Sequence, residues 1–282
     1  MRRLIVNADD FGLTAGVNRA VAELHTAGAV TSATLMAGAQ AAEGAIEIAC
    51  STPLLGVGCH VVLTGSVPVL DPREVPSLID PATGRFLANP GSFLMRLFAG
   101  HIRSDQIEAE IAAQIGRLQS AGITVTHIDT HKHTHVLPLV LQPLLRAARA
   151  CGIRAIRNPF EPAWSRRAAK QAPWTRRAQI CGIGLLSARF HRIVQEAGFV
   201  TTDGALGFVA TGLLDGSILD SLLRAMPEGT WELVSHPGYH DADLDKTHTR
   251  LKESREHERR ALLEAIPGAG VELVSFAALD EA

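Results

Sequence analysis

Short, continuous apolar runs separated by amphipathic segments recur along the whole chain, and this alternation constrains the fold more than any other feature. The runs are rich in Val, Ile, Leu and Thr, and most of them do not alternate with polar residues. This pattern is typical of strands that are buried on both faces. The candidate strands lie at 3–8, 30–38, 54–64, 123–129, 153–158, 206–211, 231–236 and 271–276.

The segments between these runs have the apolar spacing of helices. Val17, Val21 and Leu24 would share one helix face, and Gly28 would end that helix. Three further helices are predicted: one with the apolar stripe Ile107, Ile111, Ile115 and Leu118, from an N-cap at Ser104 to a stop at Gly122; one from Pro138 to Gly152 with Pro143 inside it; and a charged one from Thr247 to Ile266.

Alternating strands and helices predict an α/β fold with a parallel sheet. About eight candidate strands in 282 residues favour an irregular, TIM-like β/α barrel. We expect one domain over 1–282 with helical insertions, including a basic, Trp-bearing insertion at about 160–205. An open doubly wound sheet is the alternative, but no G-x-G-x-x-G follows the first strand, so a dinucleotide-binding fold has no support.

Composition narrows the classes of protein. The apolar fraction of 46% is enough for a large core, and the formal net charge of −2 gives no reason to expect a nucleic-acid partner. The four cysteines form no C-x-x-C pair, so we expect reduced thiols and a cytoplasmic protein. The opening "MRRLIVNADDFG" has too short an apolar run for a signal peptide, and no run reaches the roughly 18 apolar residues of a spanning helix.

Polar residues gather at one end of the predicted strands. Because the carboxyl ends of parallel strands meet at one face of a barrel, side chains from five separate runs should converge there. This convergence is a stronger signal of a functional site than any single motif. The residues are Asn7, Asp9 and Asp10 on the first run, His60 on the third, Asp129 and His131 on the fourth, Arg157 and Asn158 on the fifth, and His236 on the seventh.

The stretch "THIDTHKHTH" (126–135) places His or Asp at every odd position from 127 to 135. On an extended segment His127 and Asp129 would point inward, and His131 would lie at the rim. The chain then turns toward Pro138, which leaves the directions of His133 and His135 open. Two imidazoles and one carboxylate form a facial site for a divalent metal ion. One such His alone is more often structural; the converging carboxylates favour the metal.

Four motifs resemble one known family. They are "NADDFG" (7–12), "GCHVVLT" (58–64), "THIDTHKHTH" (126–135) and "ELVSHPGY" (232–239). In this order they resemble the YdjC-like carbohydrate deacetylases, the family of chitooligosaccharide deacetylase. The resemblance implies an irregular β/α barrel and one divalent metal ion, Mg²⁺ or Zn²⁺. The implied reaction is hydrolysis of the N-acetyl group of an N-acetylglucosamine-type sugar.

The resemblance also implies roles for residues at matching positions. Asp9 would be the general base, His236 the general acid, and Arg157 would orient Asp9 or bind substrate. The metal ligands would be Asp10, His60 and His131. The residues expected to orient these ligands or contact substrate are His127, Asp129, His133, His135, Thr64 and Tyr239.

The sequence allows more than one substrate. "HKHTHVLP" and "RNPFEPAW" resemble the branch associated with hopanoid biosynthesis, which implies an N-acetylglucosaminyl lipid. Soluble chitooligosaccharides are the alternative sugar substrate. A phosphoesterase on a similar barrel and a non-catalytic glycolipid-binding barrel are the alternatives from other classes.

The segment 161–200 supports contact with a membrane. It holds seven Lys or Arg residues against Glu161 and Glu196, together with Trp164 and Trp174, and "FLMRLFAG" (93–100) adds apolar residues elsewhere. Basic and aromatic residues together suit an anionic membrane interface, so peripheral contact with the inner face of the membrane is expected. A solvated charged face with buried Trp side chains is the alternative. A homodimer is left open.

Overall fold

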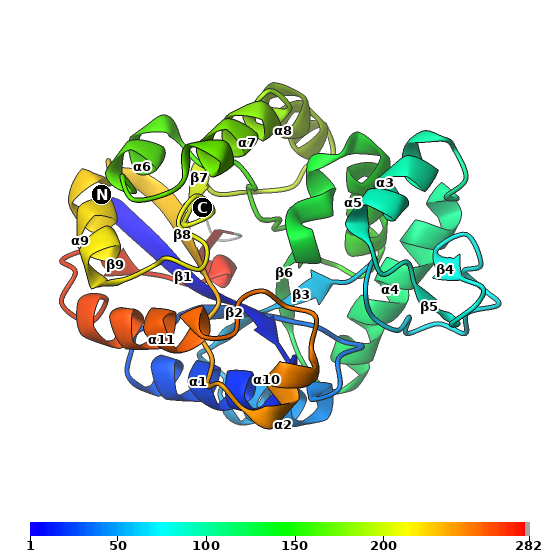
Figure 1. The fold of residues 1–282 in the computed structure, drawn as a ribbon, viewed down its shortest axis with the longest axis horizontal. Coiled ribbons are helices and arrows are strands. Elements are labelled where there is room, and N and C mark those ends of the chain that lie inside the picture. The colour runs from blue at the N-terminus through cyan, green and yellow to red at the C-terminus, as the bar shows by residue number, and fades with distance from the viewer. Residues whose placement is uncertain (280–282) are drawn as a thin grey trace.

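The computed structural model describes residues 1–279, and a parallel sheet forms its centre (Figure 1). The strands follow the order β6-β3-β2-β1-β8-β7, and β9 pairs with the first part of β1. All of these pairings are parallel, as the continuous apolar runs predicted. The strands are β1 (Arg2–Phe11), β2 (Ser32–Leu35), β3 (Gly56–Val61), β6 (Val125–Thr130), β7 (Gly204–Leu206), β8 (Gly229–Ser235) and β9 (Glu272–Leu273).

The register of the strands brings their carboxyl ends to one level. Ala8 of β1 pairs with Ser235 of β8, and His60 of β3 pairs with Asp129 of β6. The residues that follow these pairs in the chain therefore emerge at the same face of the sheet. The predicted convergence of polar strand ends thus has its basis in the strand register.

The sheet forms a parallel half-barrel, which confirms the predicted α/β class, although fewer regular strands form than the runs suggested. The run at 153–158 is not a strand: it contributes only the bridges Ile128–Ile156 and Ala155–Val200, which continue the sheet past β6. At the polar end of this run, the side-chain amide of Asn158 donates a hydrogen bond to the carbonyl of Thr202. The run at 206–211 is a strand only as far as Leu206, since Gly207 takes φ +99° and turns the chain.

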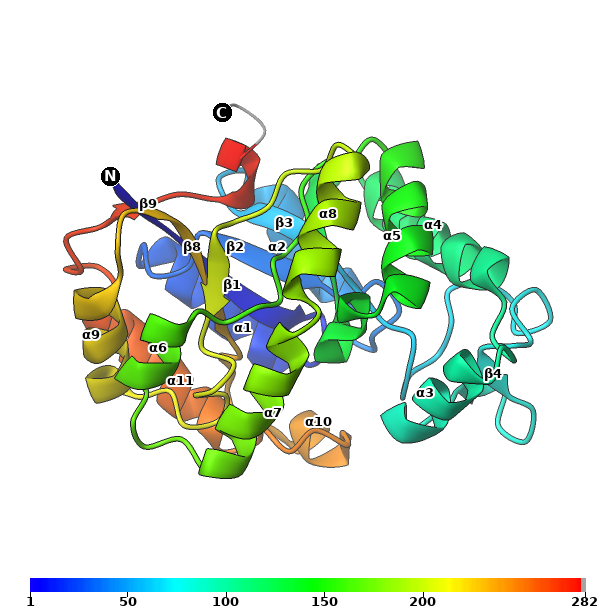
Figure 2. The same ribbon diagram turned by 90° about the horizontal axis from the view of Figure 1, so that it is seen from above.

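Helices cover the outside of the sheet (Figures 1 and 2). The apolar stripes predicted for 17–24 and 107–118 are fully buried against it. Gly28 and Gly122 end their helices with positive φ, and Pro138 begins its helix, as predicted. The main helices are α1 (Ala15–Thr26), α2 (Ala42–Ser51), α4 (Ser104–Ser120), α5 (Pro138–Ala150), α9 (Gly216–Ala225) and α11 (Ser254–Ala265).

Shorter elements occupy the connections. The hairpin β4 (Ile79–Asp80) and β5 (Arg85–Phe86) and the helix α3 (Pro90–Phe98) lie between β3 and α4. The predicted insertion near 160–205 holds α6 (Ala163–Ala168), α7 (Trp174–Gly184) and α8 (Ser187–Glu196). The other short helices are η1 (His131–Val136), α10 (Ala242–Lys246) and η2 (Phe276–Leu279).

Two helix predictions need correction. Ser104 is the first residue of α4 rather than its N-cap, and its hydroxyl accepts a hydrogen bond from Arg146. The charged helix predicted from Thr247 begins only at Ser254, because α10 ends at Lys246 and a non-helical stretch follows it. Among residues 1–279, no helix has both the length and the apolar character needed to cross a membrane.

Candidate active site

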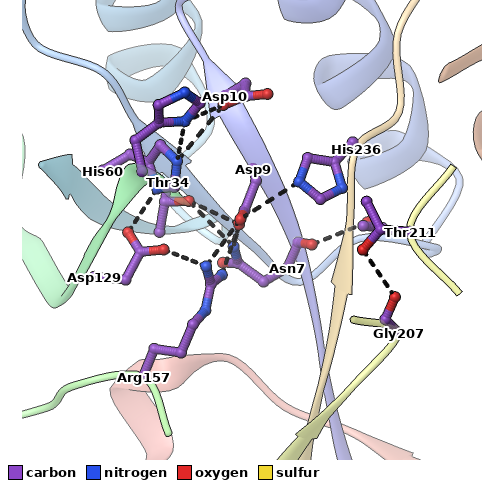
Figure 3. Close-up of polar contacts among 12 residues, drawn as sticks. Asn7, Asp9, Asp10, Thr34, His60, Asp129, Arg157, Gly207, Thr211 and His236 are labelled. Carbon is purple, nitrogen blue, oxygen red and sulfur yellow. Dashed lines mark hydrogen bonds and ion pairs between the residues drawn. The ribbon is translucent and has the colours of Figure 1, made fainter. Parts of the chain in front are cut away.

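The end of β1 supplies two adjacent carboxylates that point in different directions (Figure 3). Asp9 and Asp10 are 1% and 3% exposed. Asp10 takes φ +64°, in the left-handed region that few non-glycine residues adopt. Asn and Asp tolerate that region better than most residues. The backbone turn at Asp10 therefore separates the surroundings of the two side chains.

Asp10, His60 and His131 face one another at the end of the sheet. Their candidate ligand atoms all lie within 4.8 Å of one another. The Asp10 Oδ1 lies 3.2 Å from the His131 Nδ1 and 3.5 Å from the His60 Nε2. This oxygen is buried and has no hydrogen-bond partner among the described residues. A buried, unpartnered carboxylate oxygen beside two imidazole nitrogens fits a divalent cation.

Asp129 sets the orientation of the His60 ring. Its Oδ1 lies 2.7 Å from the His60 Nδ1, so the proton of this contact belongs on Nδ1 and Nε2 is directed at the cluster. Without a bound cation, burial acts to lower the pKa of His60, but Asp129 and Asp10 outweigh it and raise the pKa to about 10. Since only neutral imidazole binds a metal, a cation entering this site displaces a proton.

Asp9 is held by donors on all sides. Its Oδ1 accepts hydrogen bonds from Asn7 at 2.8 Å and Thr34 at 3.0 Å, and Arg157 donates to both of its oxygens at 2.6 and 2.8 Å. Burial acts to raise the pKa of Asp9, but Arg157 and then His60 outweigh burial and hold the pKa well below its usual range. Asp9 is therefore a carboxylate throughout the neutral pH range.

Arg157 lies at the centre of three buried carboxylates. Besides Asp9, its guanidinium donates to Asp129 and, at 2.8 Å from Nε, to Glu232. Arg157 is fully buried, which favours a role in orienting Asp9 over a role in binding substrate. Burial raises the pKa of Glu232 to about 7, and Arg157 opposes this shift only in part.

Asp9, His60 and Asp129 form a second cluster with metal-ligand spacing. Here both carboxylates are already neutralised by the guanidinium of Arg157, and the His60 nitrogen that faces Asp129 carries a proton. A cation in this cluster would have to displace the guanidinium of Arg157 from both carboxylates, whereas Asp10 pairs with Arg255 through Oδ2 alone and keeps Oδ1 free. The cluster of Asp10, His60 and His131 therefore fits a metal better.

His236 follows β8 and lies on the other side of Asp9 from His60 (Figure 3). Its Nε2 lies 3.9 Å from the Asp9 Oδ2, and its side chain is 13% exposed. The side chain of His131 is 27% exposed. His131 beside Asp10 and His236 beside Asp9 are therefore the partly exposed rings of the site.

Two residues expected in the site lie elsewhere. His127 stacks on Phe276 with ring centroids 3.7 Å apart, and its Nδ1 contacts the Thr126 hydroxyl; it makes no hydrogen bond to His60 or His131, so it does not orient a ligand as expected. Tyr239 packs on the outer side between α1 and α11. Its hydroxyl donates to Glu23 at 2.5 Å. The guanidinium of Arg19 lies 3.5 Å from the centre of its ring, so Tyr239 is not available to substrate.

The remaining expected residues make no side-chain hydrogen bond with the proposed ligands within residues 1–279. His135 is fully buried and its Nδ1 lies 2.7 Å from the Thr130 hydroxyl. Burial lowers its pKa to about 4. His133 takes φ +52° and packs edge-on against Phe208 at 4.5 Å. Thr64 is buried in the loop after β3.

Several site residues were missed from the sequence. Thr34 donates to Asp9, and Glu232 accepts from Arg157. Asn7, which also donates to Asp9, was among the residues expected at this end of the sheet. Glu232 had a visible signal, because it is a lone charge inside the apolar run of β8. Arg255 of α11 donates to the Asp10 Oδ2 at 2.5 Å. It had no such signal, because the neighbouring residues 252–260 are mostly charged.

The fold and the site define a class of protein: a half-barrel α/β protein with a carboxylate–imidazole cluster of metal-ligand spacing beside an arginine-held aspartate. The family model described as "YdjC-like protein" matches residues 3–266. The chain therefore belongs to the YdjC-like family.

Individual relatives support this assignment over most of the chain. A carbohydrate deacetylase of Mus musculus is 35% identical over 84% of this chain and 78% of that protein. A chitooligosaccharide deacetylase of Serratia marcescens is 32% identical over 97% of each chain. A crystal structure of a candidate cellobiose-phosphate cleavage protein from Enterococcus faecalis V583 superposes with a TM-score of 0.77 and 26% identity. That match covers 99% of this chain and 98% of the other.

Proposed function

We propose that the protein is a divalent-metal-dependent hydrolase that removes the N-acetyl group from an amino sugar. The observation that carries this proposal is the convergence of Asp10, His60 and His131 beside the carboxylate of Asp9. Relatives named carbohydrate deacetylase and chitooligosaccharide deacetylase support the same chemistry.

The proposed metal ligands are Asp10, His60 and His131, and the donor set admits Mg²⁺ or Zn²⁺. A divalent ion held by these three residues would lower the pKa of a water molecule and polarise the acetamide carbonyl. Asp9 then acts as the general base that removes a proton from the attacking water. Asn7, Thr34 and Arg157 hold the Asp9 carboxylate in place for that transfer.

His236 is the proposed general acid. An amide nitrogen leaves poorly unless it is protonated, and an imidazolium can donate that proton near neutral pH. His236 lies on the opposite side of Asp9 from His60, which suits delivery of a proton to the leaving group. Asp129 would keep the His60 ring in the tautomer that a metal requires.

The ligand assignment can be tested by removing one imidazole at a time. His60→Ala and His131→Ala should each lose the bound ion and nearly all release of free amine from an N-acetylglucosaminide, while circular dichroism shows an intact fold. Full activity in both variants would reject the site. Release of phosphate from phosphoesters instead of amine would favour the phosphoesterase alternative, and failure to release either product would favour a non-catalytic barrel.

We further propose an N-acetylglucosaminyl lipid as the substrate, with a hopanoid as the implied lipid. The surface of α7 supports this choice, because none of its residues is buried and Trp174 is 78% exposed. Leu185, directly after α7, is 86% exposed, and α3 exposes Met95 and Phe98 at 70% and 66%. Trp164, by contrast, packs against Trp231 with ring centroids 5.1 Å apart.

The basic residues of 161–200 fall into two groups. Arg166, Arg176 and Arg177 donate to backbone carbonyls and help to hold the local fold. Four others are exposed and make no side-chain hydrogen bond or ion pair within residues 1–279: Arg167, Lys170, Arg189 and Arg192. Only this second group is free to meet an anionic lipid surface, where each cation contributes about 1 kcal/mol.

A vesicle experiment tests the lipid proposal. The protein should sediment with phosphatidylglycerol vesicles at low salt and less at high salt. Reversal of Arg167, Lys170, Arg189 and Arg192 to Glu should abolish sedimentation and slow turnover of a vesicle-embedded glycolipid. Turnover of a soluble N-acetylglucosaminide serves as the control and should not change. A wild-type protein that ignores vesicles and prefers chitooligosaccharides would leave the deacetylase proposal standing without the lipid.

A further inference from the structure

We propose that α11 is a positioning element of the site, in which Arg255 holds the metal ligand Asp10 and Glu258 holds the backbone of His236. The inference rests on the proposed function, since it assigns a task to residues around the proposed ligand and acid. Neither residue belongs to the strand-end motifs. Both lie on a helix outside the sheet, between α9 and α1 (Figure 1).

Arg255 and Glu258 are buried, although they belong to a helix rich in charged residues. Arg255 and Glu258 are three positions apart, so they occupy the same face of α11. They are 0% and 1% exposed. Arg and Glu are almost never fully buried unless they are paired, so each must have a specific partner in the interior.

Arg255 finds its partner in the proposed metal ligand. Its Nη2 donates to the Asp10 Oδ2 at 2.5 Å, while its Nε and Nη1 have no acceptor within residues 1–279. Asp10 is therefore the one carboxylate that ion-pairs with this buried guanidinium among the described residues. With Oδ2 engaged, Asp10 presents Oδ1 alone to His60 and His131.

Glu258 holds the backbone beside the proposed acid. Its Oε2 accepts from the amide of His236 at 2.6 Å, and its Oε1 accepts from the amide of Gly212 at 3.2 Å. One carboxylate thus joins the segment that leaves β8 to the loop that follows β7. These two hydrogen bonds fix the position of the His236 backbone, from which its imidazole ring extends.

The packing of α11 on the same turn leaves little room for movement. The amide of Gly238 donates to the carbonyl of Arg255 at 3.2 Å. A Cβ built on Gly238 would lie 3.0 Å from the Cδ of Arg255, so the turn and the helix are in close contact. Because one rigid helix holds both Asp10 and His236, it sets the separation between the metal ligand and the acid.

Two variants separate the two contacts. Arg255→Met keeps the length of the side chain but removes its donors, and it should weaken Zn²⁺ binding by the metal-free protein about 10- to 100-fold, as loss of a ligand's hydrogen-bond partner typically does. Arg255→Lys, which keeps a cation, should recover part of that affinity. Arg260→Gln is the matched control, because Arg260 lies on the same helix and is 61% exposed.

Glu258→Ala should leave Zn²⁺ affinity within about twofold of wild type. It should lower kcat for an N-acetyl substrate more than for an activated acetate ester, whose leaving group needs no proton. Glu258→Gln retains an acceptor oxygen and should recover part of the amide activity. Thermal unfolding of every variant shows whether the fold is intact. If Arg255→Met or Glu258→Ala unfolds the protein, the comparison is made with Arg255→Lys or Glu258→Gln instead.

The outcomes distinguish the two proposals. If the wild type binds Zn²⁺ and deacetylates but Arg255→Met and Glu258→Ala behave like Arg260→Gln, the role of α11 is rejected and the proposed function survives. If the wild type neither binds the ion nor releases amine, the proposed function fails and the role of α11 fails with it. Loss of ion affinity confined to Arg255 variants, with loss of amide turnover in Glu258→Ala, supports the inference.

Discussion

Asp9 and Asp10 are identical neighbours in the chain, and their surroundings alone divide their roles. Asp9 accepts from Asn7, Thr34 and Arg157, which leaves it an ionised and fixed carboxylate. Asp10 is anchored through one oxygen, and its other oxygen is buried without a hydrogen-bond partner. Four hydrogen bonds hold Asp9 at a fixed position, and the open oxygen of Asp10 suits a cation.

Asp9→Asn tests this division. The amide is isosteric but cannot take up a proton, so we expect kcat to fall by about 10²- to 10⁴-fold while the ion stays bound. Elemental analysis of the purified variant measures the ion directly. An empty site in Asp9→Asn would mean that the roles of the two aspartates are wrongly divided.

His236→Ala tests the acid. The variant should lose most of its activity on an N-acetyl sugar, because the amine departs only when it is protonated. An activated acetate ester should be affected much less. The ratio of kcat/KM for the two substrates is the measurement, and equal losses on both would assign His236 to binding or structure.

At the scale of residues, the sequence predicted most of the side chains at the ends of strands and missed Thr34 and Glu232 within strands and Arg255 on a helix outside the sheet. His60, Asp129 and His131 follow from strand periodicity and parallel register. Arg255 does not, because charged residues on a helix normally face solvent and nothing local marks one that turns inward. His127 was misplaced because periodicity gives the direction of a side chain and not its depth in the barrel.

At the scale of elements, α4 holds the end of β3 in place. Gln114 pairs with Val62 like a strand neighbour: its side chain donates to the Val62 carbonyl at 2.8 Å and accepts from the Val62 amide at 2.9 Å. Glu110, one turn earlier, accepts from the amides of Val69 and Leu70. The Gln114 contacts fix the chain two residues after His60, and the Glu110 contacts fix the loop that follows.

Gln114→Leu should destabilise the protein markedly. It leaves a buried amide and a buried carbonyl of Val62 without partners, and each such group costs about 1–3 kcal/mol. Urea unfolding measures the loss. Ser120→Ala, at an exposed position on the same helix whose side chain makes no hydrogen bond within residues 1–279, is the control and should change stability by no more than about 0.5 kcal/mol. Equal stability of the two variants would show that the side chain of Gln114 is not needed to complete the sheet.

Elements with a strong apolar period were predictable, and irregular ones were not. The faces of α1 and α4 were visible in the sequence because each must bury a stripe against the sheet. The segment 153–158 looked like a strand because it is apolar, but its backbone pairs only through isolated bridges at Ala155 and Ile156. Residues 247–253 are polar and charged, like the exposed face of a helix, but they lack the regularly spaced apolar residues that a helix would bury.

At the scale of the whole molecule, buried histidines should make stability depend on pH. Burial lowers the pKa of His127 and His133 to about 3 and that of His135 to about 4. The unfolded chain binds protons at these residues near pH 6.5 and the folded chain does not, so stability should fall as the pH drops from 6.5 toward 4. Glu232, with its pKa raised to about 7, and His60, with its pKa raised to about 10, act in the opposite direction, but they are two groups against three.

The free energy of unfolding of the metal-free protein should therefore be lower at pH 5.5 than at pH 7, by about 1.4 kcal/mol per pH unit for each net proton taken up. Urea titrations at the two pH values measure it. His127→Leu removes one of the three imidazoles and should flatten the dependence. A protein equally stable at both values would show that these histidines are protonated in the folded state.

The most direct test of the central claim is release of free amine from an N-acetylglucosaminide by the protein stripped of metal, before and after a divalent ion is restored. The stripped protein should be inactive, and Zn²⁺ or Mg²⁺ should restore turnover to the wild type but not to His131→Ala. Equal amine release with and without the ion, or no release from any N-acetylated sugar after the ion is restored, would contradict the account.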